Sequence, residues 1–205
     1  MTHLTPQEKA RIQQAVGDAE ARTQAHVAVS IVPASDRYLL YPVAWSAVVA
    51  LLAAGVLAIG WPRFPLREAF AVEALVFVVL SLVLEWWPLR LKLVPATIRH
   101  HRAEALAHRE FAARVLASKE RKGGVLIFVS LGERYAQILA DRDAHARVGA
   151  AAWQKILADT VAAAKTRPVA DAVIAAIESC AAALTPAHAA AQPTTEAIHN
   201  GVRDK

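Results

Sequence analysis

Residues 30–62 read SIVPASDRYLLYPVAWSAVVALLAAGVLAIGWP, and this stretch decides the fold. It begins like the end of a strand in a soluble α/β domain, yet residues 38–62 contain no charged side chain. A helix that crosses a bilayer needs about 20 predominantly apolar residues. Residues 41–61 supply them, with tyrosine and tryptophan near the ends as in interfacial belts. The stretch therefore predicts a transmembrane helix that interrupts a soluble domain.

A second apolar run, residues 68–87, follows a proline-containing linker and leads into the tetrapeptide EWWP. Because proline stops helices, the two runs predict a transmembrane hairpin within residues 38–94, with both soluble flanks on one side of the membrane. The alternative is a buried helical pair in a soluble protein. A domain this small could hardly wrap two helices that are apolar on every face, which favours the membrane.

The second run contains one acid, Glu73. An ionised acid in hydrocarbon costs about 2.5 kcal/mol or more at the helix centre. We therefore expect Glu73 to lie near the interface, where Arg63 or Arg67 can pair with it. A proton- or ion-handling role is the alternative, and it would require the hairpin to oligomerise into a conduit.

Basic residues near the ends of the spans predict the side on which the soluble domain lies. Six lie outside the hairpin and two at its tip: Arg22, Arg37, Arg90, Lys92, Arg99 and Arg102 against Arg63 and Arg67. The excess predicts a cytoplasmic domain. The first residues show no apolar region of a cleavable signal peptide, and the single cysteine, Cys180, excludes an internal disulfide.

The flanking segments, residues 4–37 and 95–185, predict one discontinuous α/β domain, and residues 187–205 a disordered tail. Helical stretches begin near residues 5, 95, 148 and 168, and the first of them opens with the capping-box pattern of Thr5 and Glu8. Strands are expected in HVAVSIVP, GGVLIFVSL and YAQILAD. The first is apolar on both faces, as in an inner strand. A long crossover favours a parallel first pair, and a tight turn makes the third strand antiparallel.

This topology predicts two polar rims. The first strand and the second end at the same edge of the sheet, so Ser35 and Asp36 should meet Ser130, Glu133 and Arg134 there. Asp36 could also pair with Arg37 or with a basic residue after the hairpin. The end of the third strand places Asp141 and Asp143 at the opposite edge.

The order of these segments carries a family resemblance. Residues 18–38 (DAEARTQAHVAVSIVPASDRY) precede a basic helix with Ala107 and Phe111. Residues 123–141 (GGVLIFVSLGERYAQILAD) and a tryptophan helix at residues 151–157 follow. Together they resemble the TPM domain family, in particular its bacterial membrane-protein branch, in which a transmembrane hairpin interrupts the domain after the first strand.

The resemblance covers residues 4–185 and implies a small mixed-sheet α/β sandwich with helices on both faces. It also implies a bacterial inner-membrane protein. Phosphatase activity or divalent-metal binding has been proposed for some members of that family, and most bacterial members have no assigned function.

Two polar groups are candidates for a functional site. Asp141 and Asp143 could hold a divalent cation together with carbonyl oxygens, or could serve as turn and helix-start residues. An aspartate-nucleophile phosphotransferase is disfavoured, because the strand comes late in the chain and is an expected edge strand. Residues Ser35, Asp36, Ser130, Glu133 and Arg134 could bind a ligand or partner, or form a hydrated layer next to the headgroups.

The remaining histidine, cysteine and basic residues are weaker candidates for a functional site. His100 and Glu104 have a metal-pair spacing but no third ligand. Cys180 lies on an apolar helix stripe, which indicates a buried thiol. Basic residues lack the interleaved aromatics of nucleic-acid binders, so no nucleic-acid partner is expected.

Three functions remain open from sequence alone. The first is a non-catalytic interaction or assembly module that binds the lipid bilayer and a membrane-protein partner or its own copy. The second is a weak metal-dependent phosphatase or other hydrolase. The third is an oligomeric ion or proton conduit formed by the hairpin. No cofactor is evident beyond a possible divalent cation.

Overall fold

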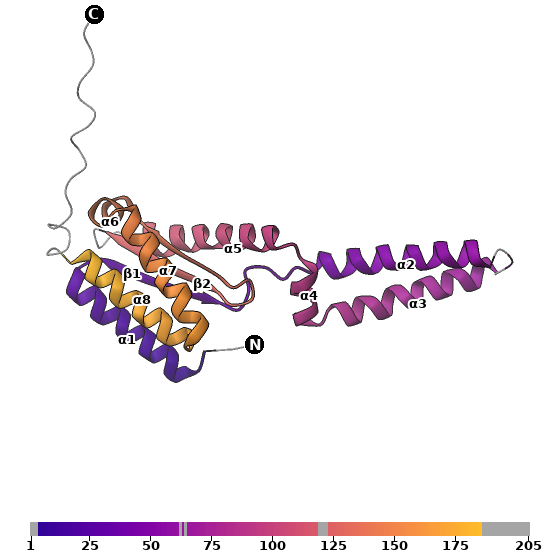
Figure 1. Cartoon of the computed structure of the whole chain (residues 1–205), viewed down its shortest axis with the longest axis horizontal. Coiled ribbons are helices and arrows are strands. Elements are labelled where there is room, and N and C mark those ends of the chain that lie inside the picture. Colours follow the sequence, from indigo (N-terminus) through magenta and orange to yellow (C-terminus); the bar gives the residue numbers. More distant parts are fainter. Residues whose placement is uncertain (1–3, 62, 64, 119–122, 186–205) are drawn as a thin grey trace, which may run out of the picture. The chain divides into compact units, whose positions relative to one another are not determined.

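The computed structural model describes residues 4–61, 63, 65–118 and 123–185 (Figure 1). The chain divides into two compact units. Unit 1 comprises Met1–Pro33 and Glu104–Lys205, and unit 2 comprises Ala34–Ala103. The protein is mixed α/β, 71% helical, with one small three-stranded mixed sheet. The expected tail at residues 187–205 lies outside the described residues.

The sheet of unit 1 has the order β1-β2-β3, formed by His26–Val32, Gly124–Ser130 and Tyr135–Ala140. β1 pairs with β2 in parallel, and β2 pairs with β3 antiparallel, which confirms the predicted pairing. The expectation that the first strand is an inner strand was wrong. β2 is the central strand, and β1 has apolar residues on both faces because helices cover both faces of the sheet.

Helices cover the two faces of the sheet unequally. One face of β2 presents Val125 and Ile127 to the main core, which α1, α6, α7 and α8 complete. The opposite face presents Leu126 and Phe128, which are fully buried. The π-helix η1 packs against β1 and β2 there. The helices of unit 1 are α1 (Pro6–Thr23), α6 (Arg142–Val148), α7 (Ala150–Thr166), α8 (Val169–Leu184) and η1 (Ala112–Leu116).

Two helix starts follow directly from the sequence. The Thr5 side chain accepts a hydrogen bond from the Glu8 amide, and Glu8 accepts one from the Thr5 amide, so the predicted capping box is confirmed. After β3, a short helix, α6, precedes the helix expected from residue 148, which is α7. α6 starts at the N-cap Asp141, and Gly149, with φ of 84°, separates it from α7.

The helix expected after the hairpin is α5 (Ala96–Phe111), which crosses the boundary between the units and continues into η1. Ala103, Ala107 and Val115 are buried, as their spacing predicts. The widening into a π-helix was not expected.

Unit 2 contains the predicted hairpin as two helices that pack side by side, α2 (Leu40–Gly60) and α3 (Leu66–Leu84), followed by a short α4 (Trp87–Leu93) (Figure 1). α4 was not predicted, because Pro88 was taken as a stop although proline is tolerated in the first turn of a helix. Arg90, a residue of α4, is buried, and its guanidinium donates to the carbonyls of Arg37 and Glu85. These bonds tie the entry of the hairpin to its exit.

In the part of the chain that the structure describes, one helix, α2, is long and apolar enough to cross a membrane. Its most apolar 18 residues have a mean hydropathy of 2.3, and 11% of them are buried. α3 does not meet this criterion because Arg67, Glu68 and Glu73 lie in its first half. The second transmembrane span therefore stays a prediction.

Glu73 lies about two turns into α3 and lines a small hollow between α2 and α3. Ala47, Ala50 and Phe77 line the same hollow. Among the described residues, no ion pair joins Glu73 to Arg63 or Arg67. The expected pairing at the tip is thus not seen.

Candidate functional site

The turn between β2 and β3, residues 131–134, is fixed to the end of β1. The Leu131 amide donates to the Val32 carbonyl at 3.0 Å, and the Gly132 amide donates to the Pro33 carbonyl at 2.9 Å. Pro33 is the last residue of unit 1 before the chain enters unit 2. The turn therefore lies at the edge of the sheet from which the hairpin segment departs.

Within this turn, one charged side chain is directed inward and one outward. The Ser130 hydroxyl donates to the Glu133 carboxylate, and both side chains are buried. Arg134 has a φ of 51°, in the left-handed region that costs energy for a residue other than glycine. Its side chain is exposed. Backbone strain of this kind occurs more often at functional sites than elsewhere.

A pocket of about 480 Å³ lies beside this turn, entirely within unit 1. The start of β3 and the facing sides of α7 and α8 form its walls. Its lining is mainly apolar, including Val129, Val161, Val169 and Val173. Pockets of this size and composition are typical of small-molecule sites.

The polar groups of the pocket are few. Ser130, Tyr135 and Thr160 line it, but their hydroxyl groups donate to Glu133, Gln137 and the Ile156 carbonyl. Arg134 and Lys165 contribute the only charges among the described lining residues. Neither cation forms an ion pair or a side-chain hydrogen bond with any other described residue. No carboxylate is among the lining residues that the structure describes. It therefore combines apolar walls with unneutralised positive charge.

Tyr135, one of the residues that line the pocket, has a perturbed hydroxyl group. Burial raises the pKa of the Tyr135 hydroxyl, and the nearby carboxylate of Glu104 raises it further. Glu104 is the first residue of unit 1 after the hairpin segment. Glu104 therefore lies close enough to Tyr135 to affect its charge state, within the same unit.

The predicted polar rim is assembled in part. Ser130, Glu133 and Arg134 lie together as expected. Ser35 and Asp36 belong to unit 2. There, Asp36 accepts a hydrogen bond from the Arg37 amide at 2.6 Å and pairs with Arg102 at 3.6 Å, which confirms the expected pairing with a basic residue after the hairpin. The meeting of Ser35 and Asp36 with the turn stays a prediction.

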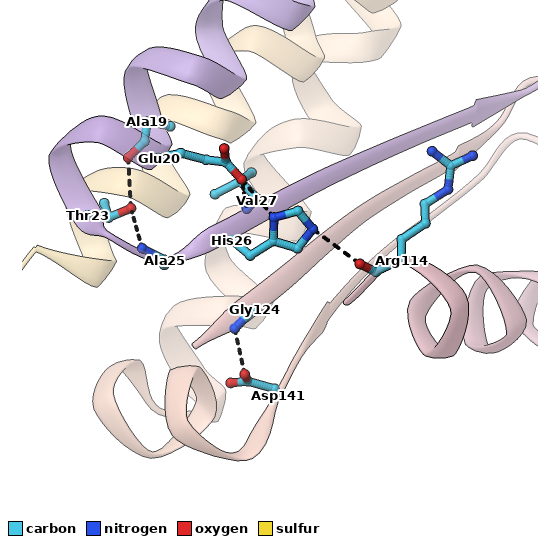
Figure 2. A network of polar contacts seen from close by, with 9 residues as sticks. All are labelled: Ala19, Glu20, Thr23, Ala25, His26, Val27, Arg114, Gly124 and Asp141. Carbon is cyan, nitrogen blue, oxygen red and sulfur yellow. Dashed lines mark hydrogen bonds and ion pairs between the residues drawn. The ribbon is translucent and has the colours of Figure 1, made fainter. Parts of the chain in front are cut away.

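At the opposite edge of the sheet, Asp141 holds two backbone amides. Its Oδ2 accepts from Gly124 at 2.6 Å and its Oδ1 from Ala144 at 2.8 Å. Figure 2 shows the first of these bonds, which ties the end of β3 to the start of β2. Asp143 is exposed on the first turn of α6. This arrangement favours the helix-start interpretation of Asp141 over the cation interpretation.

No group of three or more His, Cys, Asp or Glu side chains that could hold a metal occurs in the described ranges. The divalent-cation site at Asp141 and Asp143 was inferred from sequence alone and stays a prediction. His100 also gains no third ligand among these residues.

A second polar network lies at the start of β1 (Figure 2). Glu20 Oε1 lies 2.8 Å from His26 Nδ1 and accepts from the Val27 amide at 3.0 Å. The other ring nitrogen of His26 lies 3.2 Å from the carbonyl of Arg114. Both ring nitrogens therefore face acceptor oxygens, an arrangement that a doubly protonated imidazole satisfies. This network links α1, β1 and η1 and is structural.

Sequence reasoning missed the pocket because its residues come from distant segments. Arg134 was predicted as a site residue, but neither Lys165 nor Thr160 was singled out as one. Thr160 donates to the Ile156 carbonyl at 2.6 Å and lines the pocket floor. The only local signal is a basic residue in the last turn of α7, which is too common to be diagnostic.

No family model, no curated protein and no solved structure matches this chain. The likeness to TPM domains therefore rests on the order and composition of the segments alone.

Proposed function

We propose that this protein is a TPM-like α/β domain anchored in a bacterial inner membrane by its helical hairpin, and that it acts as an interaction or assembly module. The main observation that supports this proposal is the exposure of the apolar side chains of α2. This helix has 21 residues, contains no charged residue, and buries only Pro42, Ser46 and Ala50. A soluble monomer rarely exposes such a large apolar surface, and a bilayer satisfies it on every side.

The geometry of Glu73 supports insertion of the second helix as well. Acids within membrane-spanning helices usually face neighbouring helices rather than lipid. Glu73 lines the hollow between α2 and α3. From residue 69 to the end of α3 at residue 84 the helix is apolar apart from Glu73 and Ser81, and extends about 24 Å. This is a few ångströms short of the average hydrocarbon core, which local thinning accommodates.

Hydrolase chemistry is not part of the proposal. The carboxylate that a phosphatase mechanism would need, Asp141, already holds the amides of Gly124 and Ala144. A conduit is not proposed either, because the two helices of one hairpin cannot enclose a pathway. An assembly role requires no chemistry from the domain but does require a binding surface, for which the pocket beside the β2–β3 turn is a candidate.

Membrane fractionation tests the anchor. After lysis without detergent and ultracentrifugation, the full chain should be in the pellet and should resist extraction at alkaline pH. A chain that stays in the supernatant would contradict the proposal.

Cysteine labelling of intact and inverted membranes tests the topology. Ser35→Cys and Thr97→Cys should react with an impermeant maleimide from the cytoplasmic side, and Arg63→Cys from the other. The native Cys180 stays silent, because it is buried and its burial raises the pKa of its thiol to about 12. Labelling of Ser35→Cys and Thr97→Cys from opposite sides would eliminate the hairpin.

A phosphatase assay separates the module from the enzyme. The purified chain with Mg²⁺ or Mn²⁺ should release no phosphate from a generic aryl phosphate above background. Turnover that disappears in both the Asp141→Ala and the Asp143→Ala variants would replace the module by the hydrolase.

A further inference from the structure

We infer that the pocket between the β2–β3 turn and the helices α7 and α8 binds an amphipathic carboxylate, an alkyl chain with a single anionic head, such as a fatty acid. The inference is independent of the membrane anchor, because every lining residue belongs to unit 1. It assigns a ligand class to the pocket, which the interaction role alone does not require.

The shape of the pocket selects for an apolar body. Four valines, Val129, Val161, Val169 and Val173, together with Leu131 and the alanines of the facing helices, form the walls. Such walls offer no hydrogen bond to a sugar, a base or a peptide backbone, and burying those polar groups unpaired costs about 1–3 kcal/mol each. An alkyl chain is the occupant that loses nothing on entering.

The charge at the pocket selects for an anionic head. Arg134 and Lys165 lie on different elements, the turn and the end of α7, and both line the same pocket. Neither is neutralised by a carboxylate in the described residues. The nearest acid in sequence, Glu133, is turned away into a hydrogen bond with Ser130. Charge-assisted bonds to a carboxylate are stronger than neutral ones and suit the forked donors of arginine.

The backbone strain at Arg134 fits the same role. A φ of 51° costs energy for an arginine, whereas a glycine would adopt it without this cost. The turn is held in this conformation by the bonds of Leu131 and Gly132 to the end of β1. It thereby presents the arginine side chain at the pocket mouth.

Thiol protection measures occupancy directly. In the full chain in phosphatidylcholine nanodiscs, Ala164→Cys places a thiol on the exposed part of the pocket lining, and Ala162→Cys is the matched control on the same helix outside it. Decanoate below its micelle concentration should slow the reaction of the Ala164→Cys variant with a water-soluble methanethiosulfonate at least fivefold. The Ala162→Cys variant should not change. Val161→Cys provides a second reporter if the first variant folds poorly.

Three probes test the two parts of the ligand. Decanol has the chain without the charge, acetate has the charge without the chain, and decyltrimethylammonium reverses the charge. Each should protect the Ala164→Cys variant less than twofold. Equal protection by decanol or by the cation would show an unselective apolar groove and overturn the inference. Equal protection by acetate would overturn the need for an apolar body.

Charge removal gives the final test. Combining Arg134→Gln with Lys165→Gln should weaken the protection by decanoate at least tenfold. The control pair Arg142→Gln and Lys155→Gln removes the same charge from exposed positions outside the pocket and should keep it. Folding is verified in each variant by the silence of Cys180. Protection that survives in the first pair, disappears equally in both pairs, or is absent in the unaltered pocket overturns the inference.

Discussion

The two compact units treat apolar side chains in opposite ways. In unit 1, α8 buries its apolar stripe, including Val173, Ile177 and Leu184, against α1, α7 and the sheet. In unit 2, α3 has no buried residue and α2 has three. All three helices are rich in apolar residues, but only the apolar face of α8 is covered by other parts of the protein. The difference teaches that hydrophobicity alone does not distinguish a core helix from a membrane helix, and that the width of the apolar face does.

Charged side chains bind backbone groups in both units, but the groups that they bind differ. In unit 1, Glu20 and Asp141 accept hydrogen bonds from backbone amides at the starts of β1, β2 and α6. Unit 2 places its one buried guanidinium, Arg90, at the base of the hairpin, where it holds carbonyl oxygens. In both cases the charge lies where the secondary structure leaves backbone groups unpaired.

The largest expected effect comes from charges on the exposed face of α2. The double variant Leu52→Arg with Val56→Arg should lose membrane association, because each arginine costs about 2.5–3.5 kcal/mol near the centre of a spanning helix. The fraction of chain in the alkali-resistant pellet measures it. The control pair Ala151→Arg and Gln154→Arg, on the exposed face of α7, should stay in the pellet. Loss in both pairs would mean that charge acts through folding or expression.

A matched pair of leucines compares the interiors of the two units. Leu126 on β2 is fully buried, and Leu52 on α2 is 64% exposed in the protein alone. Leu126→Ala should lower the free energy of unfolding of unit 1 by about 2–5 kcal/mol, through lost burial and a cavity. Leu52→Ala should change it by less than about 0.5 kcal/mol.

Urea titration of the full chain in nanodiscs, read by the accessibility of Cys180, measures this difference, since Cys180 lies in the core of unit 1. Equal losses in the two variants would contradict the division into separately stabilised units.

Much of unit 1 could be predicted because its signals are local. The β-branched run of β2, the capping box of Thr5 and Glu8, and the helix start at Asp141 each depend on a few neighbouring residues. The parallel pairing of β1 with β2 followed from the length of the crossover between them. The burial of Ile177 and Cys180 followed from helical spacing.

The features that could not be predicted depend on residues far apart in the sequence. β1 was taken for an inner strand because it is apolar on both faces, but helices rather than strands supply the second cover. The pocket needs Arg134 and Lys165 to converge from two elements, and no spacing rule encodes that. The short helix α4 was not predicted, because Pro88 can either end a helix or occupy the first turn of one.

A smaller effect separates two neighbouring acids at the edge of the sheet. Asp141→Ala leaves the amides of Gly124 and Ala144 without their acceptor and should lower the free energy of unfolding by about 1–3 kcal/mol. Asp143→Ala removes an exposed first-turn charge and should lower it by less than about 1 kcal/mol. Thermal unfolding with and without Mn²⁺ measures both. Equal losses, together with stabilisation by Mn²⁺ that both variants lack, would restore the cation site.

The smallest effect concerns the start of α1 and sharpens the contrast with the uncapped α2, whose N-terminus has no side-chain cap. The backbone amide and the hydroxyl of Thr5 lower the pKa of the Glu8 carboxyl below its usual value of 4.5. A lowered pKa in the folded state means that the bond stabilises the protein above the unfolded pKa and that this contribution disappears as the pH falls through the folded pKa. Glu8→Gln should therefore lower the melting temperature slightly at pH 7 and less at pH 3. Glu178→Gln, an exposed acid on α8, should show no such trend, and a Glu8→Gln deficit that grows on acidification would contradict the capping box as the source of the effect.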